Sequence, residues 1–131
     1  MLKVVLDTNI LVSSLLASGP PASIIDLAVQ KKIIPVYNDF ILCEYWDVLS
    51  RDRFGFTSSQ IVRLIEDIAN AGIAMENEAP SCFKMRDEDD RIFYDTAMIA
   101  AAYLITGNKR HFPSQPFVVS PVDFLKTYHE T

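Results

Sequence analysis

The stretch LKVVLDTN, residues 2–9, decides the fold class of the chain. Residues 2–6 are apolar apart from Lys3, a composition typical of a strand buried on both faces of a parallel sheet. The apolar run stops at Asp7, so a carboxylate directly follows the strand. That carboxylate must be hydrated, hydrogen-bonded or bound to a metal, because burying it unpaired would cost several kcal/mol. Alternatively, Asp7 or Asn9 could simply cap the helix that follows.

Short apolar strands alternate with helices along the rest of the chain. Residues 33–37, 103–106 and 117–119 predict three further strands. Helices are predicted over 10–16, 22–32, 39–51 with Asn38 as the cap, 57–72 from a TSSQ capping box to a glycine stop, 87–102 and 121–128. Strands that are apolar throughout and separated by helices indicate an α/β protein with a parallel sheet covered on both faces.

Composition narrows the class of protein. The 131 residues are 50% hydrophobic and 22% charged, which predicts one compact domain over residues 1–131. The net charge of −5 disfavours sequence-blind coating of nucleic acid. No stretch approaches the roughly 18 uninterrupted apolar residues of a membrane helix. Cys43 and Cys82 share no CxxC spacing and have no histidine nearby, so we expect free thiols and a cytoplasmic protein.

Several acidic and amide side chains could share one edge of the predicted sheet. Asp7 follows the first strand and Asn108 follows the strand at 103–106, and ligands of open α/β sheets bind at the carboxyl ends of the strands. Glu44 falls within the apolar stripe of its predicted helix. An ion pair, or a solvated position at the border of the stripe, would also explain Glu44.

Four acidic residues in a row, DEDD at 87–90, begin a predicted helix. Acidic residues in a first turn complement the helix dipole, which is sufficient reason for some of them. Four together nevertheless repel one another, and a divalent cation would relieve that repulsion. Asp7, Glu44 and Asp90, with Asn108 as a neutral oxygen donor, are hard oxygen ligands that suit Mg²⁺ or Mn²⁺. Glycine-rich phosphate loops and a nucleophilic serine elbow are absent from the sequence.

Four stretches, in order along nearly the whole chain, resemble one known family. They are LDTNILVS at 6–13, Glu44 with VLSR at 48–51, DEDDRIFY at 87–94 and YLITGNKRHFP at 103–113. The ordered set is similar to the PIN domain, in particular to the bacterial VapC-like toxin components of toxin–antitoxin systems. The resemblance implies a three-layer α/β/α sandwich with a central parallel sheet and a metal-dependent ribonuclease.

The resemblance also implies roles for individual residues. Asp7, Glu44 and Asp90 match the acidic triad that holds Mg²⁺ or Mn²⁺, and Asn108 matches a fourth position that is Asp in many relatives. The missing charge at Asn108 predicts weaker metal binding or a single ion. The implied reaction is hydrolysis of an RNA phosphodiester to a 5′-phosphate and a 3′-hydroxyl. Further residues are expected to orient the carboxylates (Thr8, Asn9, Asp87 and Thr106) or to contact RNA phosphates (Lys109, Arg110 and His111).

Alternatives remain at this point. A PIN-like module could bind RNA or a protein without cleaving it, and a receiver-like regulatory domain would have similar layers. Lys109, Arg110 and His111 could equally form an ordinary solvated turn. The family implies an RNA substrate, an antitoxin partner and a homodimer, for which Phe40, Tyr45 and Trp46 are candidate contacts unless they belong to the core.

Overall fold

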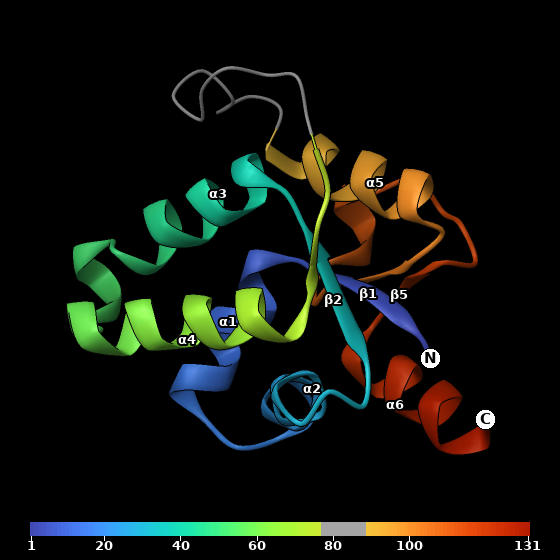
Figure 1. Cartoon of the computed structure of the whole chain (residues 1–131), viewed down its shortest axis with the longest axis horizontal. Coiled ribbons are helices and arrows are strands. Elements are labelled where there is room, and N and C mark those ends of the chain that lie inside the picture. The colour runs from blue at the N-terminus through green and yellow to red at the C-terminus, as the bar shows by residue number, and fades with distance from the viewer. Residues whose placement is uncertain (77–88) are drawn as a thin grey trace.

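The computed structural model of the chain describes residues 1–76 and 89–131. Its five strands form a parallel sheet in the order β3-β2-β1-β4-β5 (Figure 1). The strands are β1 (Lys3–Leu6), β2 (Ile34–Tyr37), β3 (Ile73–Ala74), β4 (Tyr103–Ile105) and β5 (Val118–Val119). The helices are α1 (Thr8–Leu16), α2 (Pro20–Val29), α3 (Asp39–Leu49), α4 (Ser58–Ala71), α5 (Asp89–Ala100) and α6 (Pro121–Glu130), with short 3-10 helices η1 (Asp52–Phe54) and η3 (Lys109–His111).

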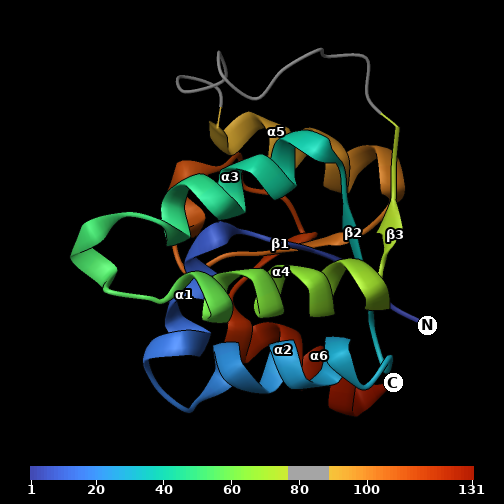
Figure 2. The same cartoon turned by 60° about the vertical axis from the view of Figure 1, so that its left-hand side comes forward.

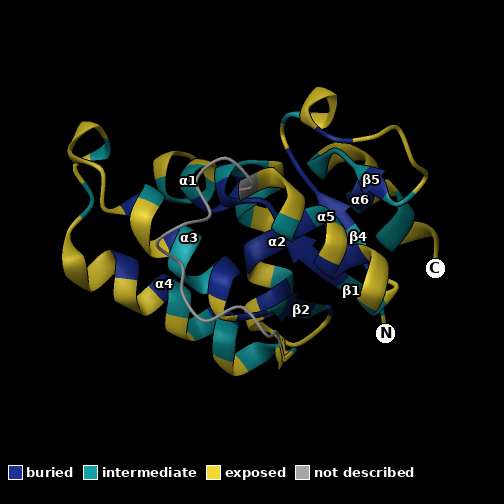
Figure 3. Ribbon diagram, turned by 90° about the horizontal axis from the view of Figure 1, so that it is seen from above, coloured by how far each residue is buried: buried dark blue, intermediate teal, exposed yellow. Residues whose placement is uncertain are grey.

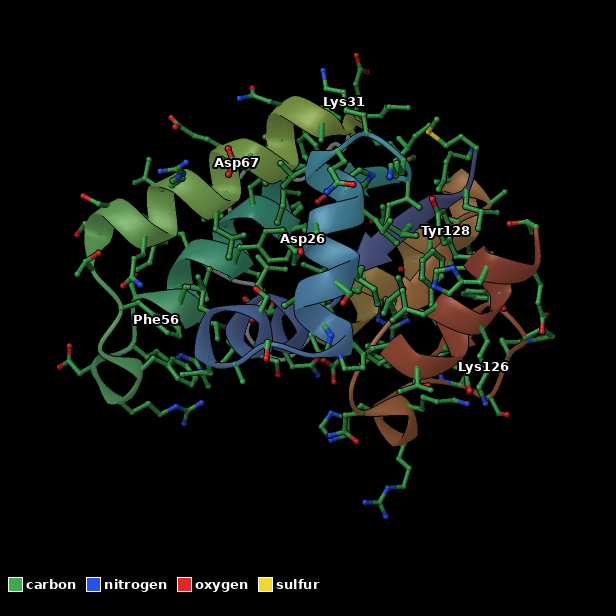
Figure 4. The ribbon with its side chains drawn as sticks, turned by 90° about the horizontal axis from the view of Figure 1, so that it is seen from below. Asp26, Lys31, Phe56, Asp67, Lys126 and Tyr128 are labelled. Atoms are coloured by element: carbon green, nitrogen blue, oxygen red, sulfur yellow. The ribbon has the colours of Figure 1, made fainter. Side chains whose placement is uncertain are left out.

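Helices cover both faces of the sheet. α3 and α5 lie on one side, and α2 and α6 lie on the other (Figure 2). Seen from below, α4, α2 and α6 lie side by side, and α2 packs against both neighbours (Figure 4). β1 and β4 are buried between these layers, whereas the outward sides of the helices are exposed (Figure 3). The prediction of an α/β sandwich around a parallel sheet is therefore confirmed.

The strand order reverses in the middle of the sheet. β1 lies at the centre, the chain adds β2 and β3 on one side of it, and then it crosses to add β4 and β5 on the other. The carboxyl ends of β1 and β4 therefore meet where the strand order reverses, which is the usual ligand position in open α/β sheets. Leu6 pairs with Ile105 in this register, so Asp7 and Thr106 follow the two strands side by side.

Two predicted helix caps are present. The side chain of Asn38 accepts a hydrogen bond of 2.9 Å from the backbone N–H of Ile41, which fixes the start of α3 at the carboxyl end of β2. At the start of α4, Thr57 and Gln60 form the reciprocal capping box. The starts of α3 and α4 are thus fixed by local interactions that the sequence pattern specifies.

Some element boundaries differ from those predicted. The helix predicted over 22–32 begins at Pro20 and ends at Val29, because Lys31 adopts a left-handed φ of 62° that a helix cannot continue. β3 was not predicted, because its two residues are exposed and form no buried apolar run. The helix predicted over 87–102 is α5, which is described from Asp89 onward.

Cys43 differs from its prediction. It is disulfide-bonded in the structure, so the prediction of a free thiol at this position is wrong. A disulfide requires two cysteines to meet in space, and the spacing of cysteines along a sequence does not reveal such a contact. The other cysteine, Cys82, lies outside the described residues.

Within the described ranges, the helices are too short to cross a membrane singly. α1 and α2 reach the required length and apolar composition only when taken together, and they form a pair bent by 104°.

Candidate active site

Asp7 is the centre of a group of polar side chains at the carboxyl ends of β1 and β4. Its backbone N–H donates a hydrogen bond of 3.0 Å to the carbonyl of Ile105, which continues the pairing of the two strands. Its Oδ2 accepts hydrogen bonds from the hydroxyl of Thr106 at 2.7 Å and from Nδ2 of Asn9 at 3.2 Å. The carboxylate is therefore held by residues that follow β1 and β4, and Asp7 is only 8% exposed.

The direction of these hydrogen bonds follows from the chemistry of the donors. The backbone N–H of Asn108 donates to Oγ1 of Thr106 at 2.9 Å, so the hydroxyl proton of Thr106 is left to donate to Asp7. The backbone N–H of Gly107 donates to Oδ1 of Asn9 at 3.0 Å, so the side-chain NH₂ group of Asn9 is directed to Asp7. The turn at 106–108 thus orients the carboxylate through two relays.

The carboxyl group of Asp7 is harder to ionise than an ordinary aspartate. Burial raises the pKa of Asp7, and the negative charge of Asp90 raises it further. The hydrogen bond from Thr106, the backbone amide of Thr8 and the nearby His111 act in the opposite direction without cancelling the rise. Asp7 and Asp90 are therefore close enough for their charges to interact, although one directly follows β1 and the other lies in α5.

Asp90 reaches the turn after β4 through His111. Nδ1 of His111 lies 3.5 Å from Oδ2 of Asp90, and Nε2 lies 3.0 Å from Nδ2 of Asn108. All three residues are at least partly exposed, whereas Asp7 and Thr106 are buried. The group therefore has a buried end at Asp7 and a solvent-facing end at His111.

α3 passes beside the buried end of this group. The hydroxyl of Tyr45 donates a hydrogen bond of 2.7 Å to the carbonyl of Leu6, the residue that precedes Asp7. Burial raises the pKa of Tyr45, and the charge of Asp7 raises it further, so the phenol stays protonated. Tyr45 is 1% exposed and stacks on Phe93 of α5, so this aromatic residue belongs to the core rather than to a surface for a partner.

Glu44 precedes Tyr45 in α3 and is half-buried. Within residues 1–76 and 89–131, no three His, Cys, Asp or Glu side chains come together as a group that could hold a metal ion. The structure thus brings Asp7 and Asp90 near each other but does not assemble them with Glu44 as one cluster. The role of Glu44 as a third metal ligand stays a prediction.

The remaining predicted site residues have different surroundings. Thr8 is buried, and its hydroxyl is the buried side-chain oxygen without a hydrogen-bond partner in the described part of the chain. Lys109 and Arg110 are exposed on η3, beside Asn108. Asp87 lies outside the described residues.

Some residues that position the site were not singled out from the sequence for that role. Tyr45 anchors α3 to the end of β1, and Gly107 orients Asn9 through its backbone N–H. Thr96 of α5 accepts a buried hydrogen bond of 3.0 Å from Nδ2 of Asn38, which ties the start of α3 to α5. The sequence offered one signal for Thr96, which is a threonine within an alanine-rich predicted helix. If such a residue is buried, its hydroxyl needs a hydrogen-bond partner.

The oxygen donors of this group suit a divalent cation. Asp7 and Asp90 supply carboxylates and Asn108 supplies a neutral amide oxygen, which are hard ligands of the kind that Mg²⁺ and Mn²⁺ prefer. A cation beside Asp7 would offset both causes of its raised pKa, the burial of the charge and the repulsion from Asp90. The chemistry of these donors therefore suits a metal of this class, although no three His, Cys, Asp or Glu side chains of the described residues form one group that could hold it.

Comparison with known proteins identifies the family of the chain. The family model described as PIN domain matches residues 3–110. The chain belongs to the PIN domain family. It is also 32% identical over 113 residues to Uncharacterized protein MJ1680 of Methanocaldococcus jannaschii, an alignment that covers 82% of this chain and 72% of that protein. No solved structure matches the chain significantly.

PIN domains are generally nucleases and usually bind divalent metal ions. The matched region includes both β1 with Asp7 and β4 with the turn at 106–108.

The raised pKa of Asp7 predicts how pH affects stability. In the folded protein the pKa of Asp7 lies above its ordinary value of 3.8, so between the two pKa values the folded state binds more protons than the unfolded state. The contribution of Asp7 to the free energy of unfolding therefore falls as pH rises through that window and stays constant above it.

Denaturant unfolding in EDTA, from about pH 3.5 to 8, would measure this effect for wild type and Asp7→Asn. We expect the two proteins to be closest in stability at the acidic end, with Asp7→Asn gaining relative to wild type as pH rises. A difference that is constant with pH, or that changes in the opposite direction, would contradict the raised pKa.

Proposed function

We propose that this PIN domain is a metal-dependent endoribonuclease that hydrolyses RNA phosphodiester bonds. The observation that carries the proposal is the buried carboxylate of Asp7, oriented by Thr106 and Asn9 and electrostatically coupled to Asp90 at the reversal of strand order. A structural cap would not need two orienting hydrogen bonds on one oxygen and a second carboxylate nearby. Membership of a family of nucleases supports the same reading.

In this proposal Asp7, Asp90 and Asn108 hold Mg²⁺ or Mn²⁺, and Glu44 completes the ligands from α3. When bound, the metal lowers the pKa of a water molecule and stabilises negative charge on the phosphoryl oxygens. Thr106 and Asn9 keep Asp7 in one orientation, so its ligand oxygens need not reorganise. The expected products carry a 5′-phosphate and a 3′-hydroxyl.

Lys109 and Arg110 give this acidic protein a local site for RNA. Both are exposed on η3, immediately after Asn108, while the whole chain has a net charge of −5. Two cations beside the acidic group attract phosphates over roughly a Debye length of about 8 Å at physiological salt. We propose that they hold the RNA backbone at the edge of the site.

Cleavage of structured and unstructured RNA with Mn²⁺, Mg²⁺ or EDTA tests this function. We expect cleavage with either metal and none with EDTA. Asp90→Asn should abolish cleavage, whereas Asp95→Asn, an exposed aspartate of the same helix, should not. If Asp90→Asn still cleaves RNA, the activity belongs to another site or to a contaminant. If cleavage is lost equally in Asp90→Asn and Asp95→Asn, the loss is not specific to the proposed site.

The finer identity of the protein is also part of the proposal. We propose a single domain over residues 1–131, acting in the cytoplasm as the toxin of a toxin–antitoxin pair and forming a homodimer. Residues beyond the family match support one domain, because β5 joins the sheet and α6 packs against α2. Trp46 is 44% exposed on α3 and is a candidate contact for an antitoxin or a second copy, whereas Phe40 and Tyr45 are buried.

A second candidate function is a PIN-like module that binds RNA or a protein without cleaving it. It is favoured by the finding that, within the described residues, no three metal-binding side chains form one group. Failure of wild type to cleave RNA with either metal, together with RNA binding in calorimetry, would support this module over the ribonuclease.

A further inference from the structure

We propose that the loop between α3 and α4 binds an unpaired base of RNA, with the guanidinium of Arg53 as the surface on which the base stacks. The loop has the sequence RDRFGF at 51–56. The inference rests on the proposed function, because it names single-stranded RNA as the substrate class of the same domain. It gives a role to a group of side chains that the acidic site does not use.

Arg53, Phe54 and Phe56 form a stacked group, which we call the arginine–phenylalanine platform. The rings of Phe54 and Phe56 are nearly parallel, with 9° between their planes and 5.5 Å between their centroids. The guanidinium carbon of Arg53 lies 4.8 Å from the centroid of the Phe54 ring, which is a cation–π contact. Both phenylalanines are half-buried and Arg53 is exposed, so the guanidinium is the solvent-facing member of the platform.

The backbone of the loop holds the platform in place. The 3-10 helix η1 is closed by a hydrogen bond of 3.1 Å from the backbone N–H of Gly55 to the carbonyl of Asp52. Gly55 adopts a left-handed φ of 68°, which residues with a Cβ rarely adopt, and this turn returns Phe56 to Phe54. Phe56 also packs against the hydrophobic core. The platform is therefore formed before any ligand binds.

The two arginines of the loop have different surroundings. Nη2 of Arg51 is paired with Oδ2 of Asp47 in α3 at 3.2 Å. Among the residues that the structure describes, Arg53 has no ion pair, and its contact is the ring of Phe54. Its N–H groups are therefore not committed to a carboxylate, so the planar cation can stack on a base and donate to a neighbouring phosphate. Unpaired bases stack on aromatic rings and guanidinium planes, whereas the bases of a duplex are already stacked on one another.

The loop projects on the same side of the molecule as the acidic group. In Figures 1 and 2, β1 runs from the N-terminus toward the side from which η1 projects, and Asp7 follows the end of β1. α3 connects the two places, because Tyr45 of α3 is hydrogen-bonded to the end of β1 and η1 follows the last turn of α3. Figure 4 shows Phe56 in this projecting loop, away from α6. RNA that extends from the acidic group along α3 would therefore meet the platform.

Binding of an unstructured RNA of about 10 nucleotides, measured by fluorescence anisotropy in EDTA, tests the platform without cleavage. We expect Arg53→Ala to weaken binding about 10-fold, as is typical of losing one stacking contact. Arg53→Lys should lose nearly as much, because lysine keeps the charge but has no planar group. Arg63→Ala removes an exposed arginine of α4 and is the matched control, for which we expect affinity near wild type.

Two further RNAs of the same length separate base stacking from attraction of phosphates. An abasic strand keeps the phosphates without the bases, and a duplex keeps the bases but pairs them. The loss of affinity in Arg53→Ala should be confined to the single strand that carries bases. An equal loss on the abasic strand, an equal loss in Arg63→Ala, or no binding of the single strand by wild type would overturn the proposal.

Cleavage of the same single strand with Mn²⁺ keeps this proposal separate from the ribonuclease activity. We expect kcat/KM of Arg53→Ala to be about 10-fold below that of wild type. Wild type that binds the strand through Arg53 without cleaving it would support the platform and contradict the ribonuclease. Cleavage with the same kcat/KM in wild type and Arg53→Ala would contradict the platform and leave the ribonuclease intact.

Discussion

Asp7→Asn is expected to reduce RNA cleavage by at least about 1000-fold, because it removes a metal ligand that contributes several kcal/mol to stabilising the transition state. The fold should survive this change. The amide oxygen of asparagine can still accept the hydrogen bonds of Thr106 and Asn9 that Asp7 accepts. The substitution also removes a buried charge whose ionisation is disfavoured by burial and by Asp90. Melting temperature without metal should therefore equal or exceed that of wild type.

Metal ions should reverse this order of stabilities. A ligand that binds only the folded state stabilises it by about 2.7 kcal/mol at 100 times its Kd, so saturating Mn²⁺ should raise the melting temperature of wild type. It should raise that of Asp7→Asn much less. Asp26→Asn is the matched control, because Asp26 is exposed on α2, on the face opposite to α3 and α5 (Figure 4). An equal effect of Mn²⁺ on all three proteins would place the metal elsewhere.

The central strand could be predicted from the sequence because burial on both faces leaves an unmistakable apolar run. β1 lies within that run, and Asp7 directly follows it as expected. β3 left no such trace, since its two residues are exposed and it is recognised only by its pairing with β2. A strand could therefore be predicted where its residues are buried and apolar, and β3 was missed because its two residues are exposed.

The contacts within the site depend on strand order, which local patterns do not encode. Thr106 donates to Asp7 across 99 residues of sequence, and Tyr45 reaches Leu6 across 39. Both contacts arise because β1 is central in the sheet, with β4 beside it and α3 in the helix layer that covers one face. The candidate residues Asp7, Asn9, Thr106 and Asn108 could be named from the sequence, but the relays that orient them required the fold.

Thr106→Val is expected to lower cleavage by about 10- to 100-fold, which is typical of losing a residue that orients a metal ligand. The hydroxyl of Thr106 links the backbone N–H of Asn108 to Oδ2 of Asp7, and the residue is fully buried. Valine has a similar shape but no hydroxyl. The substitution therefore leaves the N–H of Asn108 without its partner, at a cost of about 1–3 kcal/mol in unfolding free energy.

Thr106→Ser separates the hydroxyl from the packing of the methyl group. Serine keeps both hydrogen bonds and loses one methyl group, worth about 0.8 kcal/mol of burial, so its activity should stay near wild type although its stability falls. Steady-state kcat/KM, Mn²⁺ calorimetry and denaturant unfolding of the two variants measure the three effects separately. If Thr106 acted only by filling space, valine would retain activity at least as well as serine. The relay from Asn108 through Thr106 to Asp7 requires the opposite order, because only serine can accept one hydrogen bond and donate the other.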